Sequence, residues 1–214
     1  MDNDKALETK IQERYSQESE NSCNLSCGSN LDFLAIKQSE YILDLGCGRG
    51  NETIQAAILA GSEGMAIGLD ITSAMINKAL TNAADKEIKN IDFVVGDIEN
   101  LNLKDNFFDA VLSNCVINHA KDKKKVYCEI YRVLKYGGRF VISDAVTKYP
   151  LPPEVKNDPE AWAQCFGGSI TEEEYLENIK QSGFENIEIL KRREYLKNGY
   201  DFISVTIRAY KNKV

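Results

Sequence analysis

Apolar and polar positions follow two different periods along the chain. Short apolar runs rich in β-branched and aromatic residues are separated by segments in which apolar residues recur at helical spacing. The pattern predicts strands over 41–45, 65–70, 91–95, 108–113 and 139–143, and helices near 51–60, 73–84 and 122–135. Strands that alternate with helices form βαβ units, so we expect an α/β fold with a mostly parallel sheet.

The C-terminal part follows a different order. TEEEYLENIKQSGF (171–184) predicts a helix with a Thr N-cap, an acidic first turn and a glycine at its end. Two strand-like runs follow, NIEILKRREYL and YDFISVTIRAY, with Asn198-Gly199 between them. An Asn-Gly pair favours a tight turn, so we expect an antiparallel hairpin at one edge of the sheet.

Two segments interrupt this regular order. Residues 1–30 are polar, helical at first and then rich in Asn, Ser and Cys, while residues 148–170 hold all four prolines and the one tryptophan. A long insertion between two elements is often an active-site cover, so we interpret both segments as covers. The predicted single domain, residues 1–214, then comprises an N-terminal cover segment (1–39), a cofactor-binding core (40–147), a lid-like insertion (148–170) and a C-terminal helix and hairpin (171–214).

Composition narrows the classes of function. A chain of 214 residues that is 43% hydrophobic is long enough for one core without covalent staples. Its net charge of −7 argues against a nucleic-acid partner, and the lysine-rich run 121–125 is interpreted as a solvated helix face. The sequence has neither an apolar stretch near the ~20 residues of a membrane span nor an apolar N-terminal signal. We therefore expect a cytoplasmic protein without a membrane partner, whose six cysteines form no disulfide framework.

The glycine-rich stretch YILDLGCGRG (41–50) carries the strongest motif. A predicted helix and strand follow it, and Asp70 stands at the end of that strand. Glycines 46, 48 and 50 let the backbone turn sharply and approach a ligand, while an acid at the second strand's end can accept both ribose hydroxyls. The order of elements predicts a nucleoside cofactor.

DLGCGRG, GLDIT, GDIENL and RVLKYGG together resemble the class I S-adenosylmethionine-dependent methyltransferases, with Tyr136 where that family typically has proline. The resemblance implies a Rossmann-like, seven-stranded sheet that is mostly parallel with one antiparallel edge strand. It also implies S-adenosyl-L-methionine as cofactor, with Asp44 near the methionine part, Asp70 on the ribose and Asp97-Ile98 beside the adenine. The full set of cofactor-binding residues that it implies is Asp44, Gly46, Cys47, Gly48, Asp70, Ile71, Met75, Asp97, Ile98 and Asn114.

Cysteines stand at three places where such a fold could bind an acceptor. Cys115 lies in SNCVINH at the end of a predicted strand, where strand alternation could also direct it into the core. Cys27 and Cys165 fall in the two predicted covers, so the three thiols could converge above the methyl position. The one histidine, His119, is either a general base or a helix-capping or solvent-facing residue.

NLSCGSN, SNCVIN, LPPEV and CFGGSIT resemble, more narrowly, the arsenite methyltransferases. That resemblance implies that Cys27, Cys115 and Cys165 are the catalytic As(III) ligands, that the substrate is an As(III)-thiol complex, and that a thiol reductant such as glutathione or a thioredoxin-like protein takes part. The sequence departs from the family at Ser29-Asn30, where Asn-Pro is frequent, and at His119, where Leu is frequent. Arsenic bound by three thiolates keeps a lone pair as nucleophile, so this chemistry requires no general base.

Two alternatives remain open. The chain could methylate a small organic acceptor, such as a quinone precursor or another metabolite, with His119 as the base. It could also be a metal-binding or sensing module, because Cys23 and Cys27 have the spacing of half a zinc site.

Overall fold

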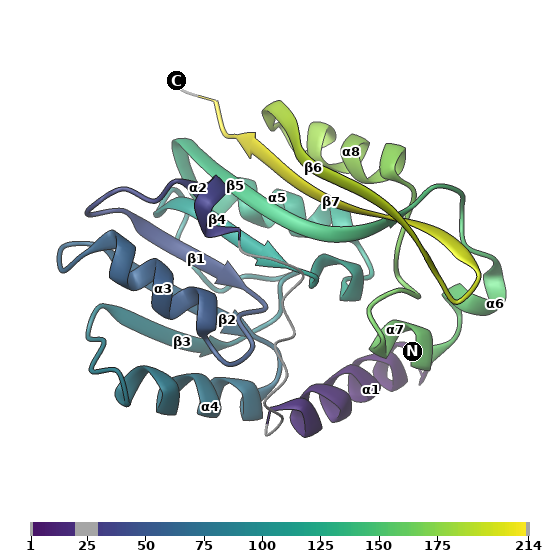
Figure 1. Cartoon of the computed structure of the whole chain (residues 1–214), viewed down its shortest axis with the longest axis horizontal. Helices are drawn as coiled ribbons and strands as arrows, with labels where there is room; N and C mark the ends of the chain where they lie inside the picture. The colour runs from purple at the N-terminus through teal and green to yellow at the C-terminus, as the bar shows by residue number, and fades with distance from the viewer. Residues whose placement is uncertain (1, 20–29, 213–214) are drawn as a thin grey trace.

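The computed structural model describes residues 2–19 and 30–212, which form a seven-stranded sheet flanked by helices (Figure 1). The strands are β1 (Tyr41–Leu45), β2 (Met65–Asp70), β3 (Ile91–Val95), β4 (Phe108–Asn114), β5 (Leu134–Thr147), β6 (Glu185–Lys197) and β7 (Tyr200–Tyr210). Their order across the sheet is β3-β2-β1-β4-β5-β7-β6. Strands β1 to β5 are parallel, whereas β7 is antiparallel to both β5 and β6.

The predicted fold class is confirmed, with one refinement at the edge of the sheet. The antiparallel strand β7 lies one place in from the edge, and β6 occupies the edge itself. The two strands form the predicted hairpin, in which Asn198 and Gly199 both have positive φ angles, 53° and 82°. A tight turn with two residues of positive φ matches the twist of the flanking strands.

Helices cover both faces of the sheet. They are α1 (Asp2–Glu18), α2 (Leu31–Leu34), α3 (Asn51–Ala60), α4 (Ser73–Ala84), α5 (Lys123–Val133), α6 (Pro153–Lys156), α7 (Pro159–Ala163) and α8 (Glu172–Gln181), with a 3-10 turn, η1, over Ile117–His119. Leu43 and Leu45 of β1 pack in one cluster with buried residues of α5 and α8. Ile42 faces the other way and packs with buried residues of α2 and α3. Alternation along the strand therefore buries apolar side chains on both faces.

Strand β5 extends beyond the predicted run 139–143. It follows α5 directly and stays paired with β7 as far as Thr147 opposite Phe202. Asp144, which looks like a polar break in the sequence, is 2% exposed and accepts hydrogen bonds from Asn118 and Tyr175. The strand continues through this position because the carboxyl group has partners inside the protein.

The two predicted covers lie against each other. Helix α1 packs beside α7, which belongs to the 148–170 insertion, and also contacts α4 (Figure 1). The Arg14 guanidinium donates a hydrogen bond to the Ala163 carbonyl oxygen, which ties α1 to the end of α7. Among the described residues, no helix is both long and apolar enough to cross a membrane.

The order of the strands determines where a ligand can enter. The chain passes from β1 to β2 and β3 on one side, and then returns to place β4 and β5 on the other side of β1. At such a reversal the loops after the two central strands diverge, which opens a crevice at their carboxyl ends.

Candidate functional site

A cavity of about 280 Å³ lies at the carboxyl ends of the central strands. Leu7, Ile11 and Tyr15 of α1 form the wall contributed by the N-terminal cover. Every residue predicted to bind the cofactor lines this cavity: Asp44, Gly46, Cys47, Gly48, Asp70, Ile71, Met75, Asp97, Ile98 and Asn114. The fold thus brings these residues together around one cavity at the ends of four strands.

The loop after β1 has the shape that its glycines permit. Gly46 has φ of 69°, and a Cβ atom there would lie 2.1 Å from Cγ2 of Val116. Gly48 has φ of 52°, but a Cβ atom there would meet nothing within 4 Å. Gly46 is therefore required by close packing against the β4 loop, whereas Gly48 leaves open space on the side where a ligand can lie.

Five carboxyl groups line the cavity, and three of them, Asp44, Glu52 and Asp70, are close enough for the charges of Glu52 and Asp70 to act on Asp44. Asp44 is 3% exposed and accepts a 2.6 Å hydrogen bond from the Thr53 hydroxyl. Burial, reinforced by the nearby Glu52 charge, raises the pKa of Asp44 to about 8. Such a cluster disfavours its own ionisation in the absence of a cation, and a cationic ligand would relieve that repulsion.

Asp70 is held by the loops on both sides of it. One carboxylate oxygen accepts a hydrogen bond from the Gly48 amide at 3.0 Å, and the other accepts one from the Thr72 amide at 2.8 Å. Burial raises the pKa of this group, and the two amide donors oppose that shift. The side chain is therefore fixed at the end of β2 before any ligand binds.

The turn after β3 forms another wall of the cavity. Ile98 is 9% exposed and presents an apolar side chain, while Asp97 is exposed. The Glu99 amide donates to a carboxylate oxygen of Asp97 at 2.8 Å. The turn thus presents an apolar surface and a hydrogen-bond acceptor side by side.

Two of the three predicted arsenic ligands meet beside the cavity. Cys115 follows β4 and lines the cavity, and its φ of 57° breaks the strand alternation that could have directed it into the core. The Cys165 thiol donates a 2.7 Å hydrogen bond to the Cys115 carbonyl oxygen. Cys27, and with it the Cys23–Cys27 pair, lies outside the described residues.

The cysteines differ in state. Cys115 is disulfide-bonded, whereas Cys47, Cys128 and Cys165 are free. The Cys115 sulfur must therefore be reduced before it can bind arsenic. Burial raises the pKa of the Cys165 thiol to about 12, so this cysteine is protonated near neutral pH. Across residues 2–19 and 30–212, no group of three His, Cys, Asp or Glu side chains is arranged to hold a metal ion.

His119 lines the cavity but is poorly suited to take up a proton. Its Nε2 atom lies 3.0 Å from the Tyr15 hydroxyl, and the two rings meet edge to face. Burial, together with the positive charges of Arg14 and Lys123, lowers the pKa of His119 to about 4. The imidazole is therefore neutral and a weak base near pH 7, which weighs against the general-base interpretation.

Sequence reasoning missed a buried polar network next to the cysteines. Lys123, which the lysine-rich run suggested was solvated, is 5% exposed and donates a 3.0 Å hydrogen bond to the Ala120 carbonyl oxygen. Its Nζ atom lies 5.6 Å from the centre of the Trp162 ring, and Trp162 lines the cavity. Burial lowers the pKa of Lys123 to about 8, and the charge of Asp144 opposes that shift. The burial of one lysine within a run of exposed lysines has no clear signal in the sequence.

Comparisons with known proteins agree with this geometry. A family model described as a methyltransferase domain matches residues 36–192. The arsenite methyltransferase of Halobacterium salinarum is 39% identical over 170 residues, which cover 79% of this chain and 44% of that protein. The crystal structure of an arsenic (III) S-adenosylmethionine methyltransferase from Chlamydomonas reinhardtii superposes with a TM-score of 0.76 at 28% identity, over 97% of this chain and 74% of that one.

A relative with another acceptor also matches. The demethylmenaquinone methyltransferase of Lactobacillus johnsonii is 31% identical over 185 residues, which cover 74% of this chain and 73% of that protein. By contrast, the chain spans about half the length of the arsenite methyltransferases that it matches.

Proposed function

The chain belongs to the methyltransferase domain family, and from this premise we propose that it methylates trivalent arsenic with S-adenosylmethionine as the methyl donor. One observation carries the choice of acceptor: the hydrogen bond that joins Cys165 to Cys115 beside the cavity. Two thiol-bearing residues from distant parts of the chain meet there, which supports a soft, thiol-binding substrate.

The cavity fits the cofactor in three respects. Asp44 and Glu52 offer negative charge to the ammonium group and the sulfonium of the methionine part. Asp70, fixed by two backbone amides, can accept hydrogen bonds from the ribose hydroxyls. The open side of Gly48 leaves room between them. When bound, S-adenosylmethionine supplies an electrophilic methyl group, so the protein's task is to align a nucleophile and exclude water.

The adenine would lie against the turn after β3. Ile98 offers an apolar surface to the flat ring, and the Asp97 carboxylate can accept a hydrogen bond from the exocyclic amine. Met75 and Ile71 line the same cavity and add apolar surface.

Arsenic would be held by thiolates from Cys27, Cys115 and Cys165. As(III) bound through three sulfurs retains a lone pair, so it is a nucleophile without losing a proton. The lowered pKa of His119 agrees with this, because an imidazole with a pKa of about 4 remains neutral and accepts a proton poorly at pH 7. A base-free reaction is thus well matched to the groups around the cavity.

A thiol reductant is part of this proposal. Cys115 is disulfide-bonded, so it must be reduced before it can bind arsenic. Glutathione or a thioredoxin-like protein would serve, and the reducing cytoplasm is the compartment in which the reaction would proceed. Binding of As(III) would also displace the proton of Cys165, so we expect arsenic binding to release protons.

Methylation of an organic acceptor such as a quinone precursor is the second candidate. The match to the Lactobacillus demethylmenaquinone methyltransferase favours it, because that match covers 73% of the relative. In this case His119 would serve as the base, but its low pKa and its contact with Tyr15 weigh against that role. A metal-sensing module fits less well with membership in a methyltransferase family.

The proposal is tested by incubating the purified, reduced protein with S-adenosylmethionine, glutathione and As(III). Methylated arsenicals separated by chromatography and measured by mass spectrometry are the expected product. Binding of S-adenosylmethionine without methylated arsenic, and with methylation of a naphthoquinol acceptor, would favour the second candidate instead.

A further inference from the structure

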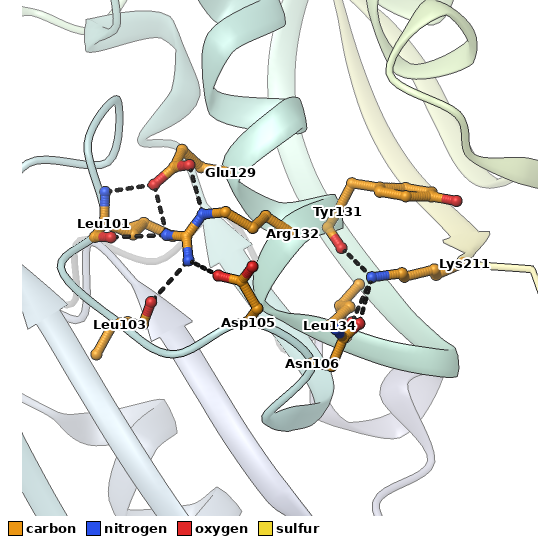
Figure 2. A network of polar contacts seen from close by, with 9 residues as sticks. All are labelled: Leu101, Leu103, Asp105, Asn106, Glu129, Tyr131, Arg132, Leu134 and Lys211. Carbon is orange, nitrogen blue, oxygen red and sulfur yellow. Dashed lines mark hydrogen bonds and ion pairs between the residues drawn. The ribbon is translucent and has the colours of Figure 1, made fainter.

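A charged pair on α5 holds the turn that forms the proposed adenine wall (Figure 2). We propose that Glu129 and Arg132 are positioning residues that set the selectivity of the cavity for the adenine base. This inference rests on the proposed function, because it concerns the nucleoside part of S-adenosylmethionine. Neither residue lines the cavity; both act through the turn and the segment that follows it.

The pair binds both polar groups of one peptide residue. A carboxylate oxygen of Glu129 accepts a 2.7 Å hydrogen bond from the Leu101 amide. The Arg132 guanidinium donates a 2.7 Å hydrogen bond to the Leu101 carbonyl oxygen. With its amide and its carbonyl held by two charged groups, Leu101 cannot shift along or rotate about the chain without breaking a charge-assisted bond.

Arg132 also binds residues further along the same segment. The guanidinium donates a further 2.7 Å hydrogen bond to the Leu103 carbonyl oxygen and forms an ion pair with Asp105. Figure 2 shows these contacts converging on one guanidinium group from the loop that follows β3. Planar guanidinium donors have a fixed spacing, which lysine cannot reproduce.

Glu129 and Arg132 also fix each other. Two parallel contacts of 2.8 Å join the carboxylate to the guanidinium. These hydrogen bonds lower the pKa of Glu129, so the pair stays ionised over the neutral range. The side chains are 18% and 30% exposed, which limits competition from water compared with a fully exposed pair.

The helix that carries the pair is itself anchored. Ile130, which lies between the two residues of the pair along α5, and Val133, which directly follows Arg132, are fully buried in the main core. The Lys211 ammonium donates hydrogen bonds of 2.8 Å to the carbonyl oxygens of Tyr131 and Leu134, at the end of the same helix (Figure 2). Glu129 and Arg132 therefore hold the loop against a rigid support.

The constraint reaches the cavity through a short turn. Asn100 donates its amide to the Asp97 carbonyl oxygen at 3.1 Å, and the two residues form an isolated bridge. Leu101 follows directly and is 4% exposed. Only the turn itself separates the held residue from Asp97 and Ile98, so a displacement at Leu101 is passed to the wall that would contact the base.

Base selectivity distinguishes this role from a general contribution to folding. S-adenosylhomocysteine and S-inosylhomocysteine differ at one position, where a 6-oxo group replaces the 6-amino donor. The Asp97 carboxylate can accept from the amine but repels the oxo group, so we expect the wild-type protein to prefer the adenosyl compound at least about tenfold. Loss of stability alone would weaken both ligands equally.

The experiment measures the dissociation constants of both compounds by calorimetry for wild type, Arg132→Lys and Glu129→Gln. The ratio of the two constants is expected to fall to about threefold or less in both variants, as the wall loses its fixed position. In the ligand-free proteins, amide hydrogen exchange over residues 97–101 should be faster than in wild type. Arg192→Lys is the matched control, since it alters a guanidinium that is paired with Glu172 and does not line the cavity, and it should change neither quantity.

The results separate the two proposals. An unchanged ratio in folded Arg132→Lys and Glu129→Gln would overturn the positioning role while leaving the proposed function intact. If Arg132→Lys does not fold, the ratio in Glu129→Gln decides in the same way. Failure of wild type to bind S-adenosylhomocysteine would overturn both proposals together.

Discussion

Burial of Asp44, a proposed cofactor-binding residue, makes the stability of the protein depend on pH. The pKa of Asp44 is raised to about 8 in the folded protein, against about 3.9 in an unfolded chain. A raised pKa means that the folded state holds a proton which the unfolded state has lost. The contribution of this group to stability is therefore complete below pH ~4 and is lost as the pH rises through about 8.

We expect the stability of ligand-free Asp44→Asn to depend less on pH than that of wild type, because asparagine does not titrate. Between pH 5 and pH 8 the variant should lose less free energy of unfolding than wild type, by at least about 1 kcal/mol. Chemical denaturation at both pH values measures this difference. The same variant should bind S-adenosylmethionine more weakly, and parallel pH dependence in the two proteins would contradict this role of Asp44.

Local sequence motifs were sufficient to predict the cavity residues that lie in or next to those motifs. They did not predict the residues that reach the cavity through packing of distant elements. The glycine loop, Asp70 and the Asp97-Ile98 turn follow from short motifs whose geometry is set by a strand end and the loop after it. Tyr15 and Trp162 line the cavity only because α1 and α7 pack together, which no local pattern indicates.

At the scale of elements, the strand and helix pattern was sufficient for most of the sheet. β1, β2 and β3 have the predicted bounds, since each is a short apolar run between polar loops. β5 was predicted too short because the burial of Asp144 depends on Asn118 and Tyr175, which lie in other parts of the chain. The position of β7 inside the sheet, with β6 at the edge, depends on pairing that a hairpin turn does not specify.

The insertion that carries α6 and α7 contains the one tryptophan of the sequence, Trp162, whose fluorescence can follow changes beside Cys165. Trp162 lines the cavity, and the Lys123 ammonium lies over its ring. The Trp162 carbonyl oxygen accepts a 2.9 Å hydrogen bond from the Cys165 amide. Arsenic binding at Cys165 should therefore move the indole relative to the charge above it.

We expect stoichiometric As(III) to change Trp162 fluorescence in the reduced protein, and Cys165→Ser to abolish the change. Cys128→Ser is the matched control, because Cys128 is an exposed thiol on α5, and it should respond like wild type. An unaltered emission spectrum at an As(III) concentration that calorimetry shows to be saturating would indicate that the insertion is a fixed structural element.

At the scale of the whole molecule, the redox state of the protein should affect the proposed arsenic binding but not the proposed cofactor binding. Reduction leaves the carboxylates and apolar groups that line the cavity unchanged, but it would convert the disulfide-bonded Cys115, which lines the same cavity and is a proposed arsenic ligand, to a thiol. Helices α1 and α7 lie side by side (Figure 1), and both contribute residues to the lining of the cavity.

Oxidised and reduced protein should therefore bind S-adenosylmethionine alike but differ in arsenic binding. At ~100 times its dissociation constant, the cofactor should stabilise either form by ~2.7 kcal/mol, seen as a rise in Tm. As(III) should bind tightly, by calorimetry, only after reduction. Equally tight arsenic binding before and after treatment with a phosphine reductant would show that Cys115 is not a ligand.

The central claim is that Cys27, Cys115 and Cys165 form one trithiolate site for arsenic beside the methyl donor. The most direct measurement is the rate of arsenite methylation by Cys27→Ser, Cys115→Ser, Cys165→Ser and the control Cys128→Ser, at equal folded concentration and with cofactor binding checked by calorimetry. With one ligand missing, arsenic can swing, and misplacement by ~1 Å can lower the rate on the order of 100-fold. We therefore expect near-complete loss of activity in the first three variants and wild-type activity in Cys128→Ser; wild-type turnover by Cys115→Ser would contradict the claim and favour an organic acceptor with His119 as base.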